Sequence, residues 1–172
     1  DLINKKQRQP NIIKINNKIF AINKNIELLE FDYKSGELIS SKKININISN
    51  DYIITSFNYI DDSFLISFKS GLILKFNNLG EIIWKYESQK TLNTKLTVFN
   101  DQILALYIDE IKSISLIDGS LIWSEIFEDL PLYQAKGGQL VNFLNLLYFV
   151  LPNNKVGSID ISLGTLHNSK FN

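Results

Sequence analysis

The sequence predicts an all-β protein built from about four repeated units, each with four antiparallel strands. Four glycines, Gly36, Gly80, Gly119 and Gly164, recur in matching contexts at spacings of 44, 39 and 45 residues. The first strand of each unit begins near position 11, 53, 96 or 139, which gives steps of 42, 43 and 43 residues. No segment has a convincing helical period, so the regular repeat decides the fold class.

The second unit shows the pattern most clearly. Segments 72–76 (LILKF) and 81–87 (EIIWKYE) are rich in β-branched and aromatic residues, which favour strands. Gly80 separates them, and a turn at this point requires a residue that can adopt positive φ. Two further strands, 52–60 and 64–68, precede this hairpin. The unit is therefore predicted to contain four strands.

The other units repeat this order, with an alternating strand before the turn glycine and another strand after it. The pairs Asn16-Asn17 and Asn100-Asp101 separate the first two strands and predict tight turns. The first three strands of these units are predicted at 12–15, 18–22 and 27–33, then at 96–99, 102–108 and 113–118, and finally at 140–144, 146–151 and 156–162.

The stretch 140–151 (LVNFLNLLYFVL) is the longest apolar run with almost no charge. It is shorter than the roughly 20 residues that a membrane helix needs. We interpret it as two buried strands with Asn145 near their turn, and the alternative interpretation is an exposed hydrophobic contact.

A polar lead-in segment, 1–10, precedes one repeat domain over 11–172. Polar connectors, the last of which contains Pro131, link the units without separating them into domains. The four units are expected at approximately 11–49, 50–92, 93–136 and 137–172.

Composition excludes several classes of site. Eighteen basic residues balance eighteen acidic ones, so no long-range field indicates nucleic acid as a partner. Cysteine is absent, which excludes disulfides, thiolate metal sites and cysteine nucleophiles. Methionine is also absent and the chain begins at Asp1, so we expect a processed chain or a fragment from which any signal peptide or lipid-anchoring cysteine has been lost.

The order of alternating strand, turn glycine, two apolar residues and tryptophan resembles the PQQ-like (quinoprotein-type) repeat of β-propellers. FNNLGEIIWKYE and LIDGSLIWSEIF match it best, whereas the first and last units keep the glycine and lack the tryptophan. The resemblance implies that Trp84 and Trp123 lie on outermost strands and pack between blades. Four blades are few for a propeller of this family. The resemblance therefore implies a fragment of a larger propeller, a half that pairs with another copy, or a compact four-bladed ring. We favour a fragment or a half, and therefore a partner contact.

No catalytic, cofactor-binding or metal-binding residue is predicted. His167 is the single histidine, and we interpret it as a substitution where the middle units have Trp. The acidic pairs Asp61-Asp62, Asp109-Glu110 and Glu128-Asp129 fall at predicted turns or connectors, where adjacent carboxylates point apart into water. The quinone and calcium ligands that the PQQ-like family implies have no counterparts that can be assigned, and we expect no cofactor.

The repeat also resembles the family of the outer-membrane assembly lipoprotein BamB. This resemblance implies a non-enzymatic protein-interaction scaffold of the periplasm or outer membrane, with a barrel-assembly subunit as a protein partner and with possible self-association that completes the propeller. One alternative is a luminal or extracytoplasmic sensor or ligand-binding propeller, and another is a fragment of a quinoprotein-related enzyme. The repeat identifies neither the partner nor the loops that contact it.

Overall fold

The computed structural model describes residues 11–47, 52–92, 94–127, 141–150 and 156–167. These residues form four antiparallel sheets, each with its four strands in chain order. We call the sheets blades 1 to 4. Their strands are β1 (Ile12–Ile15), β2 (Lys18–Ile22), β3 (Glu27–Asp32) and β4 (Leu38–Lys43); β5 (Ile54–Ile60), β6 (Ser63–Phe68), β7 (Leu72–Phe76) and β8 (Ile82–Glu87); β9 (Thr97–Phe99), β10 (Gln102–Leu106), β11 (Glu110–Ser115) and β12 (Leu121–Ile126); and β13 (Val141–Phe143), β14 (Leu146–Val150), β15 (Val156–Asp160) and β16 (Leu166–His167). The predicted all-β class and the four-stranded unit are confirmed.

The first two strands of every blade are joined by a two-residue turn. The strand partners that flank these turns are Ile15 with Lys18, Ile60 with Ser63, Phe99 with Gln102, and Phe143 with Leu146. At least one residue in each turn has positive φ, and this residue is asparagine or aspartate in the first three blades. Short polar side chains tolerate this region better than β-branched ones, which explains the polar pairs of the sequence.

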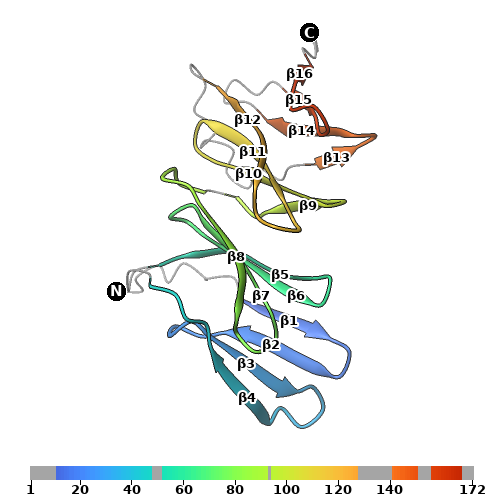
Figure 1. Cartoon of the computed structure of the whole chain (residues 1–172). Helices are drawn as coiled ribbons and strands as arrows, with labels where there is room; N and C mark the ends of the chain where they lie inside the picture. Colours follow the sequence, from blue (N-terminus) through green and yellow to red (C-terminus); the bar gives the residue numbers. More distant parts are fainter. Residues whose placement is uncertain (1–10, 48–51, 93, 128–140, 151–155, 168–172) are drawn as a thin grey trace, which may run out of the picture.

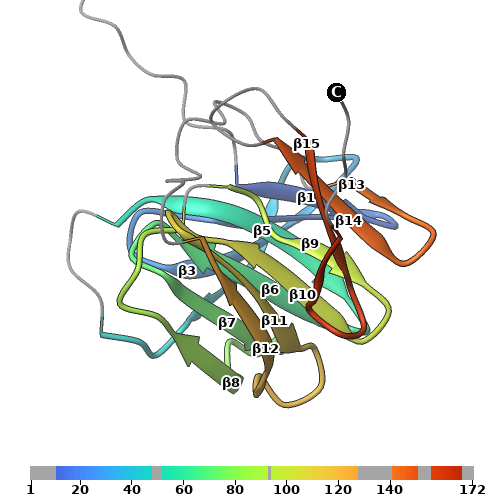
Figure 2. The same ribbon diagram turned by 90° about the horizontal axis from the view of Figure 1, so that it is seen from above.

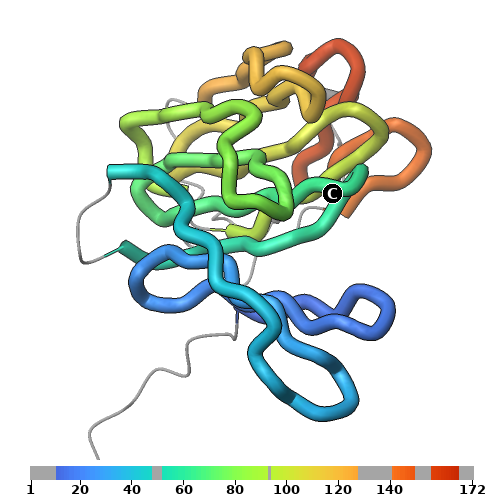
Figure 3. Tube along the Cα trace, turned by 60° about the horizontal axis from the view of Figure 1, so that its bottom comes forward, coloured from blue at the N-terminus to red at the C-terminus, as the bar shows by residue number. Residues whose placement is uncertain are grey.

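The blades follow one another in an open row. Figure 1 shows blade 1 in blue at one end and blade 4 in orange and red at the other, with blades 2 and 3 between them. The tube in Figure 3 follows the same path. In Figure 2 the first strands β1, β5 and β9 lie along one side, and the fourth strands β8 and β12 lie along the opposite side. The described chain is therefore not a closed ring of four blades, and the compact-ring alternative is wrong.

Within the described ranges, three hydrophobic cores hold the row together, one at each contact between neighbouring blades. Blades 1 and 2 share a core that includes Phe20 and Phe64, and blades 2 and 3 share one that includes Ile73 and Ile103. Blades 3 and 4 share a core that includes Leu104 and Leu147. Each sheet therefore buries its apolar residues against the next sheet, and we call these contacts seams.

Two predictions about individual strands are wrong. Strand β11 spans Glu110–Ser115, not 113–118, because residues 116–119 form the turn that leads to Gly119. The first half of the apolar run at 140–151 forms β13, but all three of its residues are exposed, and Phe143 is 63% exposed. Val141 and Phe143 pair with Tyr148 and Leu146, on the side of blade 4 that faces away from the core shared with blade 3. No helix within the described ranges is long and apolar enough to cross a membrane.

Candidate functional site

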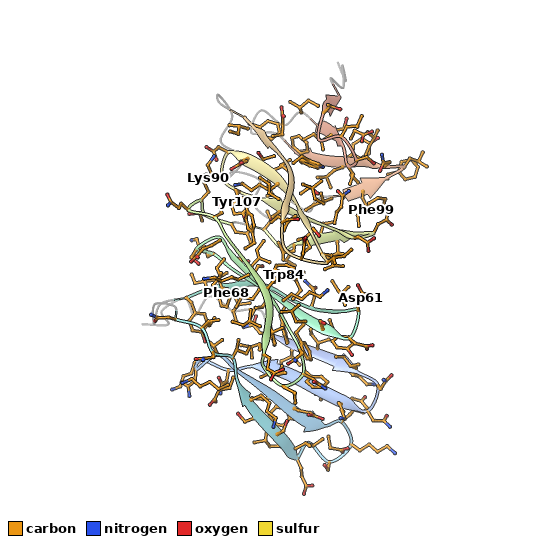
Figure 4. All side chains as sticks on the ribbon, in the orientation of Figure 1. Asp61, Phe68, Trp84, Lys90, Phe99 and Tyr107 are labelled. Carbon is orange, nitrogen blue, oxygen red and sulfur yellow. The ribbon has the colours of Figure 1, made fainter. Side chains whose placement is uncertain are left out.

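The seam between blades 2 and 3 is organised by Trp84. Its indole N–H donates to the carbonyl of Leu116 at 3.2 Å, and its ring lies against the turn at Gly119. A Cβ atom built on Gly119 would lie 2.7 Å from the Trp84 Cε3 atom, so the close approach of the ring requires glycine there. Lys75, which is paired with Trp84 across β7 and β8, also donates to the Leu116 carbonyl, at 3.0 Å. In Figure 4 Trp84 lies between the two blades.

The seam between blades 3 and 4 repeats this arrangement. The indole N–H of Trp123 donates to the carbonyl of Ile161 at 2.7 Å, and a Cβ atom on Gly164 would lie 2.6 Å from the Trp123 ring. In both seams the tryptophan of one blade covers the turn glycine of the next. The recurring sequence motif is thus one half of a contact whose other half is the glycine of the following unit.

The seam between blades 1 and 2 lacks a tryptophan. Ser40 occupies the paired position opposite Glu30, and the Lys43 carbonyl oxygen would lie 2.8 Å from a Cβ atom on Gly80. Glu30 accepts from Ser40 and forms an ion pair of 2.6 Å with Lys18. The hydrogen bond to Lys18 contributes most to lowering the pKa of Glu30. A polar bridge therefore stands where the other two seams have an indole.

An aromatic cluster forms part of the core of that first seam. The Phe64 ring lies between four others, with centroid separations of 5.0 Å to Phe20, 5.7 Å to Phe57, 5.1 Å to Tyr59 and 5.5 Å to Phe76. Such offset and tilted pairs add stability beyond the apolar area that they bury. The seam that lacks a tryptophan is thus the one with the aromatic cluster.

Gly36, the remaining predicted turn glycine, has no such cover. Its φ is +72°, close to the values at Gly119 and Gly164, but no atom of the described residues lies within 4 Å of a Cβ atom built on it. The turn backbone is otherwise the same, since the Tyr33 N–H donates to Asn17 just as the Leu116 N–H donates to Asp101. At the two tryptophan seams the ring that covers the glycine belongs to the preceding blade. The described residues include no blade before blade 1, so no tryptophan covers Gly36.

The outer face of blade 1 is the apolar face that blades 2 and 3 bury. Ile19 pairs with Phe31, in the same register as Phe64 with Phe76 in blade 2. The blade 2 residues are completely buried, whereas Ile19 and Phe31 are half-buried, and Leu38 beside Phe31 is 56% exposed. We call the surface of Ile19, Phe31, Leu38 and the Gly36 turn the blade 1 end face.

The opposite end of the row has a matching surface on blade 4. Its register row is Tyr148, Ser158 and His167, which corresponds to Leu104, Ser113 and Trp123 of blade 3. Val141 and Phe143 on β13 belong to this side of the sheet because they pair with Tyr148 and Leu146. We call the exposed Val141 and Phe143 and the half-buried Tyr148, together with the register positions of Ser158 and His167, the blade 4 end face; Ser158 itself is buried.

His167 matches the tryptophans by its place in the sheet. It follows Gly164 by three residues, whereas Trp84 and Trp123 follow their glycines by four. The β8 and β12 strands each contain a bulge that consumes one residue, and β16 pairs without one. His167 therefore opposes Ser158 as Trp123 opposes Ser113.

The fourth strands of blades 1 to 3 form a rim of sheet edges. Each of these strands has one extra residue at its bulge, Ile39, Ile83 or Ile122, which has no partner on the neighbouring strand. These isoleucines are 52%, 50% and 45% exposed. We call β4, β8 and β12 with their bulge isoleucines the outer rim. It presents apolar side chains beside unpaired backbone edges.

A group of charges crosses the seam between blades 2 and 3 at its connector end. The Lys90 ammonium lies 2.9 Å from the Asp109 carboxylate and 3.1 Å from that of Glu110, and Lys112 lies 3.4 Å from Glu110. Lys112 also donates to the Tyr86 hydroxyl at 3.1 Å. The ion pair with Asp109 contributes most to raising the pKa of Lys90. The charges are mutually compensated, as in a structural bridge.

The predicted behaviour of the acidic pairs is right at one turn and wrong at another. Asp61 and Asp62 are exposed on a hairpin turn, and Figure 4 shows Asp61 far from Lys90. Asp109 and Glu110 do not point apart into water, because the fold brings Lys90 within ion-pair distance of both carboxylates, and Glu110 is buried. The pair Glu128-Asp129 lies outside the described residues.

The turns before the repeat glycines contain a feature that the sequence interpretation missed. The first turn residue accepts hydrogen bonds from two following backbone N–H groups through its own side chain; these residues are Asp32, Asn77, Ser115 and Asp160. Such residues are typical of Asx and Ser/Thr turns. A small polar residue three or four positions before each repeat glycine was the available signal.

A shallow hollow of about 420 Å³ opens between blades 1 and 2 on the hairpin side. Phe20 and Phe64 form part of its lining, and Asn16, Tyr59 and Asp62 also border it. The Tyr59 hydroxyl donates to Asp62 at 3.0 Å, and this hydrogen bond is the main cause of the raised pKa of Tyr59. Lys18 also lines the hollow, so its polar edge carries a lysine as well as the Tyr59-Asp62 pair. Within the described part of the chain, no group of three or more His, Cys, Asp or Glu residues could hold a metal ion.

No family model and no curated protein sequence matches the chain. Solved structures do match. The computationally designed Ika8 protein aligns with a TM-score of 0.66 at 16% identity over 90% of this chain and 46% of its own, and the designed Ika4 protein with 0.63 at 14% over 87% and 89%. BamB from Moraxella catarrhalis gives 0.56 at 13% over 87% and 45%.

A quinohemoprotein alcohol dehydrogenase from Comamonas testosteroni gives a TM-score of 0.64 at 10% identity over 91% of this chain and 33% of its own. The chain thus spans about half the length of Ika8 and BamB and a third of the dehydrogenase, but most of Ika4. At these identities the likeness concerns the fold alone. The four blades of this chain have the fold of part of a β-propeller.

Proposed function

We propose that this protein is a non-enzymatic interaction scaffold that binds extended segments of a protein partner along its outer rim. The observation that carries the proposal is the repeated pairing of an exposed sheet edge with a bulge isoleucine on β4, β8 and β12. An extended segment can add to such an edge through backbone hydrogen bonds, and apolar side chains beside the edge give it anchors.

The partner that we propose is a subunit of the outer-membrane barrel-assembly machinery, in a role like that of BamB in the periplasm or at the outer membrane. The fold likeness to BamB supports this choice over a soluble peptide ligand. A strand-rich partner also fits the recognition mode, because its own segments already favour the extended conformation that an edge requires.

The first test is cross-linking of the full-length protein in its native cells, followed by mass spectrometry of the captured partners. Cross-links from β4, β8 or β12 to barrel-assembly subunits would support the proposal. Capture of a kinase or a redox chain in their place would contradict it, and would favour the sensor or the quinoprotein-related enzyme.

A pair of variants makes this test specific to the rim. Ile122→Lys places a charge at the bulge of β12, where we expect partner capture to fall about tenfold or more if one apolar anchor is lost. Ile117→Lys is the matched control, because Ile117 is in the same blade, is more exposed and lies in the turn before β12 and not on the sheet edge itself. Equal capture by both variants would contradict the rim as the binding surface.

A further inference from the structure

We infer that the two end faces of the row bind each other between two copies of this chain, so that blade 4 of each copy docks on blade 1 of the other. Two copies would then form one closed ring of eight blades. This inference concerns the end faces and not the outer rim, so it stands or falls independently of the proposed function.

The blade 1 end face has the residues that form one side of a seam, without a blade packed against them. In blades 3 and 4 the turn glycine is covered by an indole, and the carbonyl of the second turn residue, Leu116 or Ile161, accepts its N–H. The corresponding residues of blade 1 are Gly36 and Tyr33. The open space at Gly36 and the partly exposed Ile19 and Phe31 beside it are the surfaces that a preceding blade would cover.

The blade 4 end face is the complementary half. Its row of Tyr148, Ser158 and His167 has the register of the rows that dock onto the following blade at both tryptophan seams. The position that carries tryptophan in those rows carries histidine here, and imidazole is also a planar ring with an N–H donor. Phe143 and Val141 extend this face with exposed apolar surface.

Two considerations favour a second copy over another occupant. Blade 4 of one copy and blade 1 of the other would meet as successive blades meet within the chain, so a head-to-tail pair covers the two end faces described above. The chain also aligns with most of Ika4 and with about half of Ika8, so this number of blades corresponds in length to one whole chain and to half of another with the same fold.

The first measurement is the molar mass of the purified chain over a wide concentration range, by sedimentation equilibrium or light scattering. We expect a reversible species of twice 19.8 kDa. A single species of 19.8 kDa at every concentration would overturn the inference, as would an open-ended series of larger species.

Two variants, one for each end face, test the head-to-tail arrangement. Gly36→Asn fills the open space at the turn, and asparagine tolerates positive φ, so the single chain should keep its fold. Phe143→Asp places a charge on the blade 4 end face. Each variant alone should be monomeric, with dimer affinity reduced about a hundredfold or more. Ile117→Asn, in the corresponding turn of blade 3, is the control and should dimerise as the unaltered chain does.

Mixing the two variants gives the decisive result. A head-to-tail arrangement leaves one intact contact, between blade 4 of the Gly36→Asn copy and blade 1 of the Phe143→Asp copy, so the mixture should form a heterodimer that neither variant forms alone. A dimer in which like faces meet would not be restored, and this outcome would overturn the inference. His167→Trp should raise dimer affinity about tenfold, because it restores tryptophan at its register position.

Discussion

The indole N–H of Trp84 donates across a blade boundary to the carbonyl of Leu116 at 3.2 Å. The two residues are 32 positions apart in the chain. This single contact joins the end of one repeat to the turn of the next, and it explains why tryptophan and glycine recur together in the sequence. The following predictions test what such contacts contribute.

Trp84→Phe should destabilise the fold moderately and Trp84→Ala severely. Phenylalanine keeps most of the buried ring but loses the hydrogen bond, at a cost of about 1 kcal/mol in the free energy of unfolding. Alanine leaves a cavity in the seam, at a cost of about 3–5 kcal/mol. Urea unfolding measures both values. Ile83→Ala, at the exposed neighbouring residue, should change the free energy little, and an equal loss there would contradict the seam as the cause.

Gly119→Ala should destabilise the protein more than Gly36→Ala. Both glycines have φ near +75°, so an alanine at either position carries a backbone cost of about 1–2 kcal/mol. At Gly119 the new Cβ atom would also meet the Trp84 ring at 2.7 Å, whereas at Gly36 nothing lies within 4 Å. Melting temperatures of monomeric samples separate the backbone cost, which both variants share, from the contact with the Trp84 ring, which only Gly119→Ala makes. Equal losses would mean that the Trp84 ring moves away freely.

Lys75→Met should leave the stability unchanged or raise it, although it removes a hydrogen bond. Lys75 is buried, and its ammonium shares the Leu116 carbonyl with the indole of Trp84. Methionine keeps most of the apolar volume, removes a buried charge and leaves that carbonyl with the indole donor. Lys75→Ala should lower the melting temperature because it leaves a cavity. A large loss in Lys75→Met would show that the ammonium is required at the seam.

Tyr107→Phe should reduce the alkaline loss of stability. Burial is the main cause of the raised pKa of Tyr107, which is completely inaccessible to solvent. A group whose pKa is higher in the folded state favours folding fully below its unfolded pKa near 10, and this contribution is lost as the pH rises above that value. Lys90, whose pKa is also raised, acts in the same direction above about 10.5.

The check is the free energy of unfolding from pH 7 to pH 11 for the unaltered chain and for Tyr107→Phe. At neutral pH the variant should lose little, because the hydrogen bond from the Tyr107 hydroxyl to the Gly71 carbonyl is long, at 3.4 Å. At alkaline pH its stability should fall less steeply. Tyr33→Phe, at an exposed tyrosine of blade 1, is the control and should follow the unaltered chain.

Local patterns predicted most strand positions because they depend on interactions between near neighbours. Strands β1, β2 and β7 have the predicted bounds. The turns predicted at Asn16-Asn17 and Asn100-Asp101 are also present, and the first asparagine of each pair has positive φ. Strand β11 was misplaced because apolar Leu116 and Ile117 continue the alternation into a turn. That turn is formed by hydrogen bonds to the Ser115 side chain, and alternation alone does not report them.

Burial was harder to predict than strand position. Apolar residues are buried in β10 and exposed in β13, since both faces of β10 lie in hydrophobic cores and the apolar side of β13 faces away from blade 3. Likewise, Asp109 and Glu110 form a typical polar turn in sequence, and only the fold brings Lys90 close enough to hold both carboxylates.

The sequence by itself determined the strands, the turns and the period of the repeat, because hydrophobic alternation and turn chemistry act over a few residues. The tertiary structure decided which glycines are covered, which apolar faces are buried and that the blades form an open row. Those properties depend on contacts between residues more than 30 positions apart, such as Trp84 with Leu116 and Trp123 with Ile161. The other three repeat glycines each lie against atoms of the preceding blade, and Gly36 does not. The sequence around Gly36 cannot show this difference, because the exposure of a residue depends on its neighbours in space.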